Sequence, residues 1–322
     1  MKAAVSSQPG DTPGDLLADP LAGADPRPAR PRPSIWKRLA ANVSVVLGII
    51  LILLIALMGV AAPVITKDDP TAINPAGRNK GPGEEISYRN DDGKRVKKMV
   101  LMGTDTLGRD IFSRVVYGAR VSLIVGILVA VTSVAIGLFI GLVSGYYRWL
   151  DSIVMRFMDG LMAIPSILLA IALVSLSGAS LLAVIVAIAI PEIPRVVRLV
   201  RSIVLSIREE PYVEAAISVG TPTPKILYRH VLPNTIAPLI VQATYICGSA
   251  ILLEAILSFL GVGIPPETPT WGNIMAEGRG MFQLLPHNIL IPGAFLTLTV
   301  LAVNMLGDGL RDTLDPRMSK KL

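Results

Sequence analysis

The chain has 322 residues, of which 52% are hydrophobic and 17% are charged, with a formal net charge of +6 and a mean hydropathy of +0.60. This composition excludes an ordinary soluble domain, in which about 45–50% of residues are apolar and about 25% are charged. A bilayer core about 30 Å thick needs roughly 20 apolar residues in a helix. We therefore predict an all-α, polytopic membrane protein.

The N-terminal part of the chain changes character at about residue 40. The first 33 residues are rich in Pro, Ala, Asp and Gly and contain no apolar run, so they cannot offset the loss of chain entropy on folding. We predict a disordered cytoplasmic tail and pre-span segment over residues 1–40. The apolar run at residues 43–62 predicts a first transmembrane helix within residues 41–65. It begins too late and is too long for a cleavable signal peptide, so we expect this span to target the chain.

Five further apolar runs predict the remaining spans, which makes six transmembrane helices in all. They lie at about residues 121–146, 153–176, 181–200, 236–260 and 289–306. With the N-terminus in the cytoplasm, the cytoplasmic side carries 18 Lys and Arg residues and the external side 12, although 11 of those 12 lie in the first external loop. The positive-inside rule thus favours cytoplasmic termini, including a C-terminal tail over residues 311–322.

A segment with helical features, GTDTLGRDIFSRVVYGARVSL at residues 103–123, begins in the predicted external loop over residues 66–118 and runs into the second predicted span. Asp110 and Arg114 are four residues apart, in the order that stabilises a helix, and the apolar residues beside them form one stripe. We predict an amphipathic helix in the external membrane interface. It either leads into the next span or contacts the substrate.

Small residues recur in the second predicted span. Gly137, Gly141 and Gly145 are spaced four residues apart, a stripe that allows another helix to approach closely. We predict packing against another span of this chain, with a subunit interface as the less favoured alternative. The lone Cys247 excludes a disulfide or a cysteine metal site within the chain, and we expect it to pack as a small apolar residue.

Charged residues at membrane depth are costly and are therefore candidate functional groups. Glu254 has no Lys or Arg in its span, and it either lines a translocation path or hydrogen-bonds a neighbouring helix. Asp159 lies near the start of its span and either lines the same path or reaches the cytoplasmic interface. Glu192 lies between Pro191 and Pro194, where we predict that the fourth span breaks and that the carboxylate is hydrated.

A cytoplasmic loop over residues 211–234 contains the sequence EAAISVGTPTPKILYRHVLPN. Pro211 fits the first turn of a helix and Gly220 the position just past its end, where a positive φ is favourable for glycine. Thr223 and Pro224 predict the start of a second short helix, which we expect to stop at Pro233.

The first of these helices presents small residues beside larger ones. Tyr212, Ala216 and Val219 share one face by their spacing, and Ala215 flanks them without bulk, so another surface can approach closely. The loop is thus a compact helical knob. It either lies on its own spans or receives a partner.

This loop resembles the EAA loop found in permease subunits of ABC importers. The matching positions are Glu214, Ala215, Ala216, Gly220, Leu232 and Pro233. Residues 103–123, 257–272 and 304–317 resemble, in the same order, blocks of the C-type permease subunit of dipeptide and oligopeptide importers. The resemblance covers most of residues 103–317, but neither the N-terminal tail nor residues 67–102. It implies a type I ABC importer permease fold, with five helices in a permease core over residues 119–310 and a cytoplasmic coupling helix.

The family resemblance also implies partners and a mechanism. Tyr212, Glu214, Ala215, Ala216, Val219 and Gly220 would form the surface that contacts an ATPase. The complex would contain a homologous second permease subunit as a heterodimer, two ATP-binding subunits and an external or periplasmic substrate-binding protein. It would sit in the bacterial cytoplasmic (inner) membrane and import a peptide substrate, as ATPase closure drives alternating access.

Several chemical activities lack support in the sequence. There is no GxxxxGK[ST] phosphate loop, so we expect this chain to bind no ATP and no other cofactor, and not to be an enzyme itself. With only His230 and His287, neither a zinc site nor a histidine-based catalytic triad is supported, and we predict no metal site. We expect no nucleic-acid partner.

Two rival functions stay open. One is an ion-coupled secondary transporter that works alone, with Glu254 and Asp159 as proton carriers. The few charges at membrane depth and the elaborate cytoplasmic loop favour the ABC importer instead. The other is a permease of the same family for nickel or glutathione, which the sequence does not separate from a peptide permease.

Overall fold

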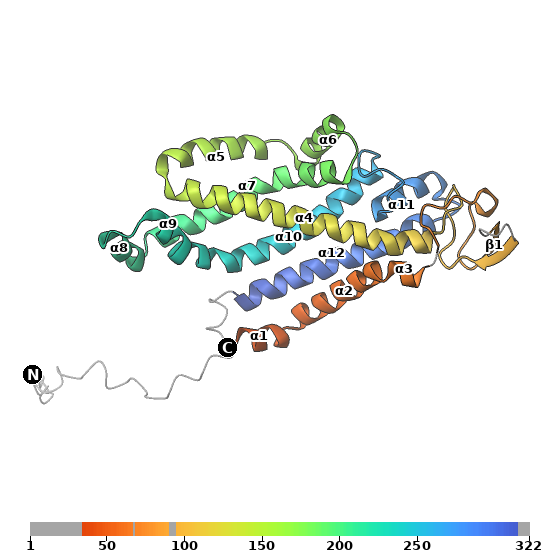
Figure 1. Cartoon of the computed structure of the whole chain (residues 1–322), viewed down its shortest axis with the longest axis horizontal. Helices are drawn as coiled ribbons and strands as arrows, with labels where there is room; N and C mark the ends of the chain where they lie inside the picture. The colour runs from red at the N-terminus through yellow and green to blue at the C-terminus, as the bar shows by residue number, and fades with distance from the viewer. Residues whose placement is uncertain (1–33, 67, 90–94, 315–322) are drawn as a thin grey trace, which may run out of the picture. The chain divides into compact units, whose positions relative to one another are not determined.

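The computed structural model describes residues 34–66, 68–89 and 95–314, and Figure 1 shows how their helices are arranged. Residues 1–33 of the predicted N-terminal tail and most of the predicted C-terminal tail lie outside the described residues, whereas residues 35–40 of the predicted pre-span segment are helical. In chain order the α-helices are α1 (Ile35–Ala41), α2 (Val43–Val60), α3 (Ala62–Ile65), α4 (Ile111–Tyr146), α5 (Arg148–Met162), α6 (Ser166–Ser177), α7 (Leu181–Arg208), α8 (Pro211–Ser218), α9 (Thr223–Ile226), α10 (Leu232–Phe259), α11 (Trp271–Gly278) and α12 (His287–Leu314). Three short turns and two strands complete them: η2 (Pro75–Gly77), η3 (Leu227–Val231), η4 (Arg279–Met281), β1 (Glu85–Arg89) and β2 (Arg95–Met99).

Four stretches of the described chain are long and apolar enough to cross a membrane, namely α2, α4, Thr223–Phe259 and α12. A fifth is added if the bent pair of α5 and α6 counts as one span. The remaining predicted span corresponds to α7, which has 28 residues but carries Glu192 and four arginines. The predicted all-α, polytopic fold class is confirmed, with one short two-stranded sheet beside the helices. The count of six spans requires both α7 and the bent pair to cross the bilayer.

The third predicted span, residues 153–176, is not one continuous helix. The chain bends by 88° between α5 and α6. Pro165 precedes α6, and a proline lacks the N–H that would continue a helix and disfavours helical geometry in the residue before it. Apolar character alone could not predict this bend.

The predicted interfacial helix is not a separate element, because α4 begins at Ile111 and runs for 36 residues without a break. Asp110 is its N-cap and accepts a hydrogen bond from the backbone N–H of Ser113 at 3.1 Å. At 1.5 Å per residue the helix is about 54 Å long, well beyond a bilayer core of about 30 Å. Its first turns are buried in the protein, and Arg114 is 1% exposed.

The glycine stripe of α4 packs against α7, which confirms the predicted contact within the chain. Each glycine faces a valine of α7 so closely that an added Cβ would overlap it. The pairs are Gly137 with Val196, Gly141 with Val200 and Gly145 with Val204, at 2.5, 2.7 and 2.9 Å from the built Cβ to the valine Cβ. Close backbone approach of this kind is what small residues provide in membrane helix pairs.

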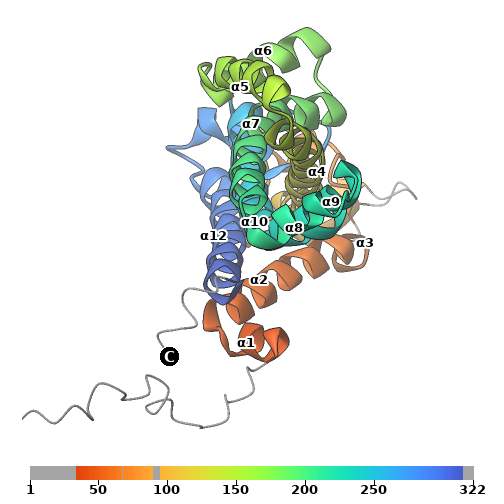
Figure 2. The ribbon, with the colours of Figure 1, turned by 90° about the vertical axis from the view of Figure 1, so that its left-hand side faces the viewer.

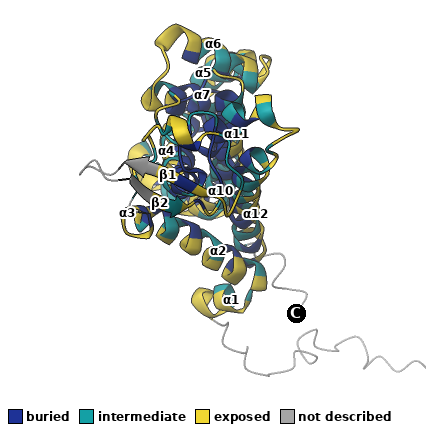
Figure 3. Cartoon of the chain, turned by 90° about the vertical axis from the view of Figure 1, so that its right-hand side faces the viewer, coloured by how far each residue is buried: buried dark blue, intermediate teal, exposed yellow. Residues whose placement is uncertain are grey.

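Two apolar clusters hold the helices together, and Figure 3 shows their buried residues in dark blue. The first joins α4, α6, α7 and α10. The second joins α4 to α2, α10, α11 and α12 around Trp271, whose indole Nε1 donates to the carbonyl of Val115 at 3.0 Å. By contrast, α2 keeps bulky side chains such as Leu54 and Leu57 exposed. An apolar surface of this extent suits contact with lipid.

The two ends of the helical part carry different structures. One end, on the left in Figure 1 and nearest the viewer in Figure 2, carries α8. The other end carries α3, α11 and an antiparallel hairpin in which Glu85 of β1 pairs with Met99 of β2. The start of α2 and the end of α12 meet where the Asn42 side-chain amide donates to the carbonyl of Gly309 at 3.3 Å.

The packing of α4 on α7 can be tested by adding one carbon. We expect Gly141→Ala to lower the unfolding temperature of the detergent-purified protein, because the new Cβ meets Val200 and the backbone oxygen of Val197. Overpacking of this kind costs about 1–3 kcal/mol.

Gly160→Ala is the matched control, since no atom lies within 4 Å of a Cβ built at this helical position. It should be as stable as the wild type or more so, because Ala in a helix is favoured over Gly by about 1 kcal/mol. Equal stability of both variants would contradict the glycine contact.

Candidate functional site

The helix α8 begins and ends as its sequence predicts. Pro211 occupies the first turn, and Gly220 adopts a φ of +75° just past the C-cap. The N–H of Gly220 donates to the carbonyl of Ile217 at 2.9 Å, and that of Thr221 to the carbonyl of Ala216 at 3.0 Å. This pair of bonds is a Schellman motif, which ends a helix in a rigid turn.

The second helix of the loop does not stop at Pro233, so that prediction is wrong. A π-helical turn, η3, connects α9 to α10, and Pro233 lies in the first turn of α10, where a missing N–H is tolerated. The side chain of Asn234 donates to the carbonyl of His230 at 2.7 Å and helps to satisfy that backbone. As a result α9, η3 and α10 form one helical stretch, Thr223–Phe259.

One apolar side chain anchors α8 to the rest of the chain. Val213 is fully buried in the cluster that also contains Ile207 of α7 and Ile226 of α9. This anchor was not predicted from the sequence, although Val213 is the one bulky aliphatic residue in the first turn of α8. Val213 thus fastens α8 between α7 and the helical stretch that continues into α10.

The predicted contact residues of α8 lie on its outer surface. Tyr212 is 45% exposed and Val219 is 80% exposed, while Glu214 and Ala215 are also exposed. Ala216 is half-buried. An exposed group of apolar side chains on a small helical knob is a surface on which a partner protein can dock.

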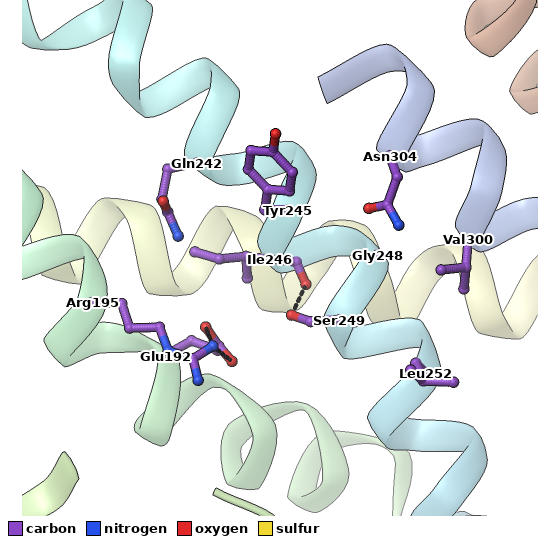
Figure 4. A pocket seen from close by; sticks show the side chains of 10 residues that line it. All are labelled: Glu192, Arg195, Gln242, Tyr245, Ile246, Gly248, Ser249, Leu252, Val300 and Asn304. Atoms are coloured by element: carbon purple, nitrogen blue, oxygen red, sulfur yellow. Dashed lines mark hydrogen bonds and ion pairs between the residues drawn. The ribbon is translucent and has the colours of Figure 1, made fainter. Parts of the chain in front are cut away.

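A cavity of about 330 Å³ lies between α7, α10 and α12, and Figure 4 shows it from close by. Six of its lining residues are polar or charged: Glu192, Arg195, Gln242, Tyr245, Ser249 and Asn304. A second cavity of about 660 Å³ adjoins it along α10 and reaches Pro233 and Asn234 at the end of the knob. The two cavities share Gln242 and Tyr245 as wall residues.

The charged residues of the first cavity form an ion pair. Arg195 Nη1 donates to both carboxylate oxygens of Glu192, at 2.9 and 3.0 Å. Glu192 is only 4% exposed, whereas the Arg195 side chain is 50% exposed. The predicted break at Pro191 and Pro194 is absent. Helix α7 continues through both prolines, and both are buried against neighbouring helices. The prediction of a hydrated Glu192 is also wrong, since the carboxylate is buried.

The two predicted pathway residues lie elsewhere. Glu254 is fully buried, and its Oε1 accepts a hydrogen bond from the Ser258 hydroxyl at 2.8 Å. Asp159 is exposed and pairs with Arg198 at 2.7 Å. Neither residue lines either cavity, and the structure does not bring them together. A pathway role for these two residues stays a prediction.

A buried ionic cluster at the opposite end was not predicted from the sequence. Arg114 Nη1 lies 2.7 Å from Asp105 Oδ2 and 2.5 Å from Glu277 Oε2, and Arg109 pairs with the same two carboxylates. Arg114 thus pairs across the fold rather than with Asp110 on its own helix. The cluster ties the loop before α4 to α11, because two guanidinium groups bridge two acids that are 172 residues apart in sequence.

The described residues contain no group of three or more His, Cys, Asp and Glu side chains placed to hold a metal ion.

Comparison with known families decides the class of the protein. Residues 133–320 match the family model described as the binding-protein-dependent transport system inner membrane component. The chain belongs to this family. Residues 33–82 also match the model for the N-terminal transmembrane domain of oligopeptide transport permease C. Both the knob and the polar cavity of this permease lie within residues 133–320.

Several relatives are similar over most of their length. A probable peptide ABC transporter permease of Sinorhizobium fredii is 51% identical over 265 residues, covering 82% of this chain and 86% of the relative. A dipeptide transport system permease of Alkalihalophilus pseudofirmus is 42% identical over 284 residues, covering 88% and 89%. A glutathione transport system permease of Pectobacterium atrosepticum is 39% identical over 285 residues, covering 88% and 90%.

The ionic cluster of this permease should be important for stability. We expect Arg114→Gln to cost about 3–5 kcal/mol, because its removal leaves the carboxylates of Asp105 and Glu277 to share the single guanidinium of Arg109. Thermal unfolding in detergent, together with protease cleavage of the loop before α4, would measure the loss.

Lys97→Gln is the control, since Lys97 pairs with Glu85 at the surface and its side chain is 77% exposed. Surface pairs contribute about 0–1 kcal/mol, so this variant should resemble the wild type. If Arg114→Gln were no less stable than Lys97→Gln, the cluster would not hold this end together.

Proposed function

We propose that this permease is the translocation-pathway subunit of an ATP-driven importer of dipeptides or oligopeptides. The observation that carries the proposal is the knob, which exposes Tyr212 of α8 and Val219 just after it, while buried Val213 fixes α8 to the rest of the chain. A surface of this kind can receive force from outside the bilayer. ATP would be bound and hydrolysed by two separate subunits, and a second, homologous permease would complete the pathway.

The mechanism follows from where the ends of α8 lead. Its N-terminal end follows α7, which carries Arg195, and its C-terminal end leads through α9 to α10, which carries Gln242. Both helices are walls of the polar cavity. A shift of α8 caused by closure of the ATP-binding subunits would therefore move two cavity walls, which supports alternating access driven from the cytoplasm.

The orientation belongs to the same proposal. Both termini and α8 would face the cytoplasm, and the hairpin and α11 would face the external substrate-binding protein. Arg208, Lys225 and Arg229 lie at or near the knob, in agreement with the positive-inside rule. The contact between Asn42 and Gly309 supports one shared side for the start of α2 and the end of α12.

Peptides are the substrate class that the relatives favour, since their names refer to peptides and dipeptides. Glutathione is a second candidate because of the glutathione permease at 39% identity. It is a peptide-like solute and fits the same class of cavity.

The docking role of α8 can be tested with a bulky side chain at a small, exposed position. We expect Ala215→Trp to reduce the amount of ATP-binding subunit that co-purifies with the permease by roughly tenfold, equivalent to about 1.4 kcal/mol. The indole would occupy the space into which a partner surface must fit.

Ala72→Trp provides the matched control, because Ala72 is equally an exposed alanine but lies in the loop between α3 and β1. It should leave co-purification unchanged. Retention of the ATP-binding subunits by Ala215→Trp, with uptake still coupled to ATP hydrolysis, would refute the docking role.

The rival secondary transporter makes a different prediction. Its uptake would persist without ATP-binding subunits and would collapse with a protonophore, whereas the importer requires those subunits. The positions of Glu254, buried away from both cavities, and of Asp159, paired at the surface, favour the importer.

A further inference from the structure

The two members of the ion pair in the polar cavity differ strongly in their exposure. Charges within a membrane-embedded bundle are costly and usually mark a pathway or a partner. Here one member, Glu192, is almost fully buried, while half of the Arg195 side chain is exposed. Figure 4 shows the two side chains together on the cavity wall formed by α7.

The guanidinium of Arg195 retains hydrogen-bonding capacity. Only its Nη1 is bound to Glu192, and Nε and Nη2 have no partner within residues 34–66, 68–89 and 95–314. A guanidinium carries five N–H donors in a planar fork that matches the two oxygens of a carboxylate. Glu192 fixes the position of this fork and offsets its charge while the cavity is empty of solute.

Two amide side chains on other helices complete the polar wall. Gln242 of α10 and Asn304 of α12 line the cavity, and neither side chain has a hydrogen-bond partner in the described part of the chain. An amide offers both a donor and an acceptor, as a peptide group does. The volume of about 330 Å³ falls in the range of about 300–1,000 Å³ for sites that hold small molecules.

We propose that Arg195 is a contact for the carboxylate of the transported peptide, an inference that rests on the proposed import function. Glu192 is its positioning residue. Gln242 and Asn304 bind the adjoining peptide group through their amides. Because Arg195 lies on α7 and Gln242 on α10, a shift of α8 changes the distance between these contacts and releases the solute.

The test uses the complete complex in liposomes, with its binding protein outside and ATP at the ATP-binding subunits. The probes are labelled L-alanyl-L-alanine and glutathione. We expect Arg195→Gln to import roughly tenfold less peptide per ATP hydrolysed, with ATP hydrolysis within about twofold of the wild type.

Arg198→Gln is the control for a general effect of charge. Arg198 lies three residues further along α7, its side chain is 47% exposed, and it pairs with Asp159 rather than with a cavity residue. Its coupling ratio should equal that of the wild type. An equal loss in Arg195→Gln and Arg198→Gln would overturn the proposed contact.

A double variant separates substrate contact from pairing. Glu192→Gln/Arg195→Gln removes both charges and leaves no unpaired buried carboxylate. If Arg195 binds the peptide, the double variant stays about tenfold impaired; if the pair is only structural, coupling returns to the wild-type ratio and the inference fails.

The wild-type complex distinguishes this inference from the proposed function. If it imports neither probe, the proposed peptide import and the contact built on it both fail. If it imports a probe and Arg195→Gln imports it equally well, only the contact fails.

Discussion

The contact between α4 and α7 is the constraint on which the rest of this permease depends. Three glycines of α4 face three valines of α7, so the two backbones approach more closely than any larger residue would allow. This contact holds α7 against an apolar neighbour although α7 carries Glu192 and four arginines. Its apolar side is buried against α4, and its charged side is left for the cavity and for ion pairs such as Arg201 with Asp151.

The knob and the cavity are connected by the same two helices, α7 and α10. Buried Val213 and the Schellman turn at Gly220 make α8 a stiff connection between α7 and α10. Packed helices move as units, because close-packed interiors transmit displacement rather than absorb it. The two helices that α8 connects, α7 and α10, are also walls of the cavity. At the opposite end, the cluster of Arg114 with Asp105 and Glu277 fixes the loop before α4 to α11.

The differences between prediction and structure share one cause. Local sequence rules treat each proline and each charged pair alone. Pro191, Pro194 and Pro233 all lie inside helical stretches. Pro191 and Pro194 are buried within the helix bundle, whereas Pro233 lies in the first turn of α10, where a missing N–H is tolerated. Pro165 does bend the chain, between α5 and α6. Likewise Arg114 pairs with acids brought near it only by the fold, rather than with Asp110 one turn away.

The sequence by itself determined the membrane class, most of the spans, the glycine stripe and the short helix with its proline start and glycine end. These features depend on amino-acid composition, on the spacing of apolar and small residues and on the backbone preferences of proline and glycine, which are local properties. Only the tertiary structure decided that Val213 anchors the knob, that Glu254 lies outside the cavities and that Glu192 and Arg195 share a cavity wall with Asn304. Such groupings depend on which faces of helices far apart in the sequence pack together. A single sequence contains no direct record of these contacts.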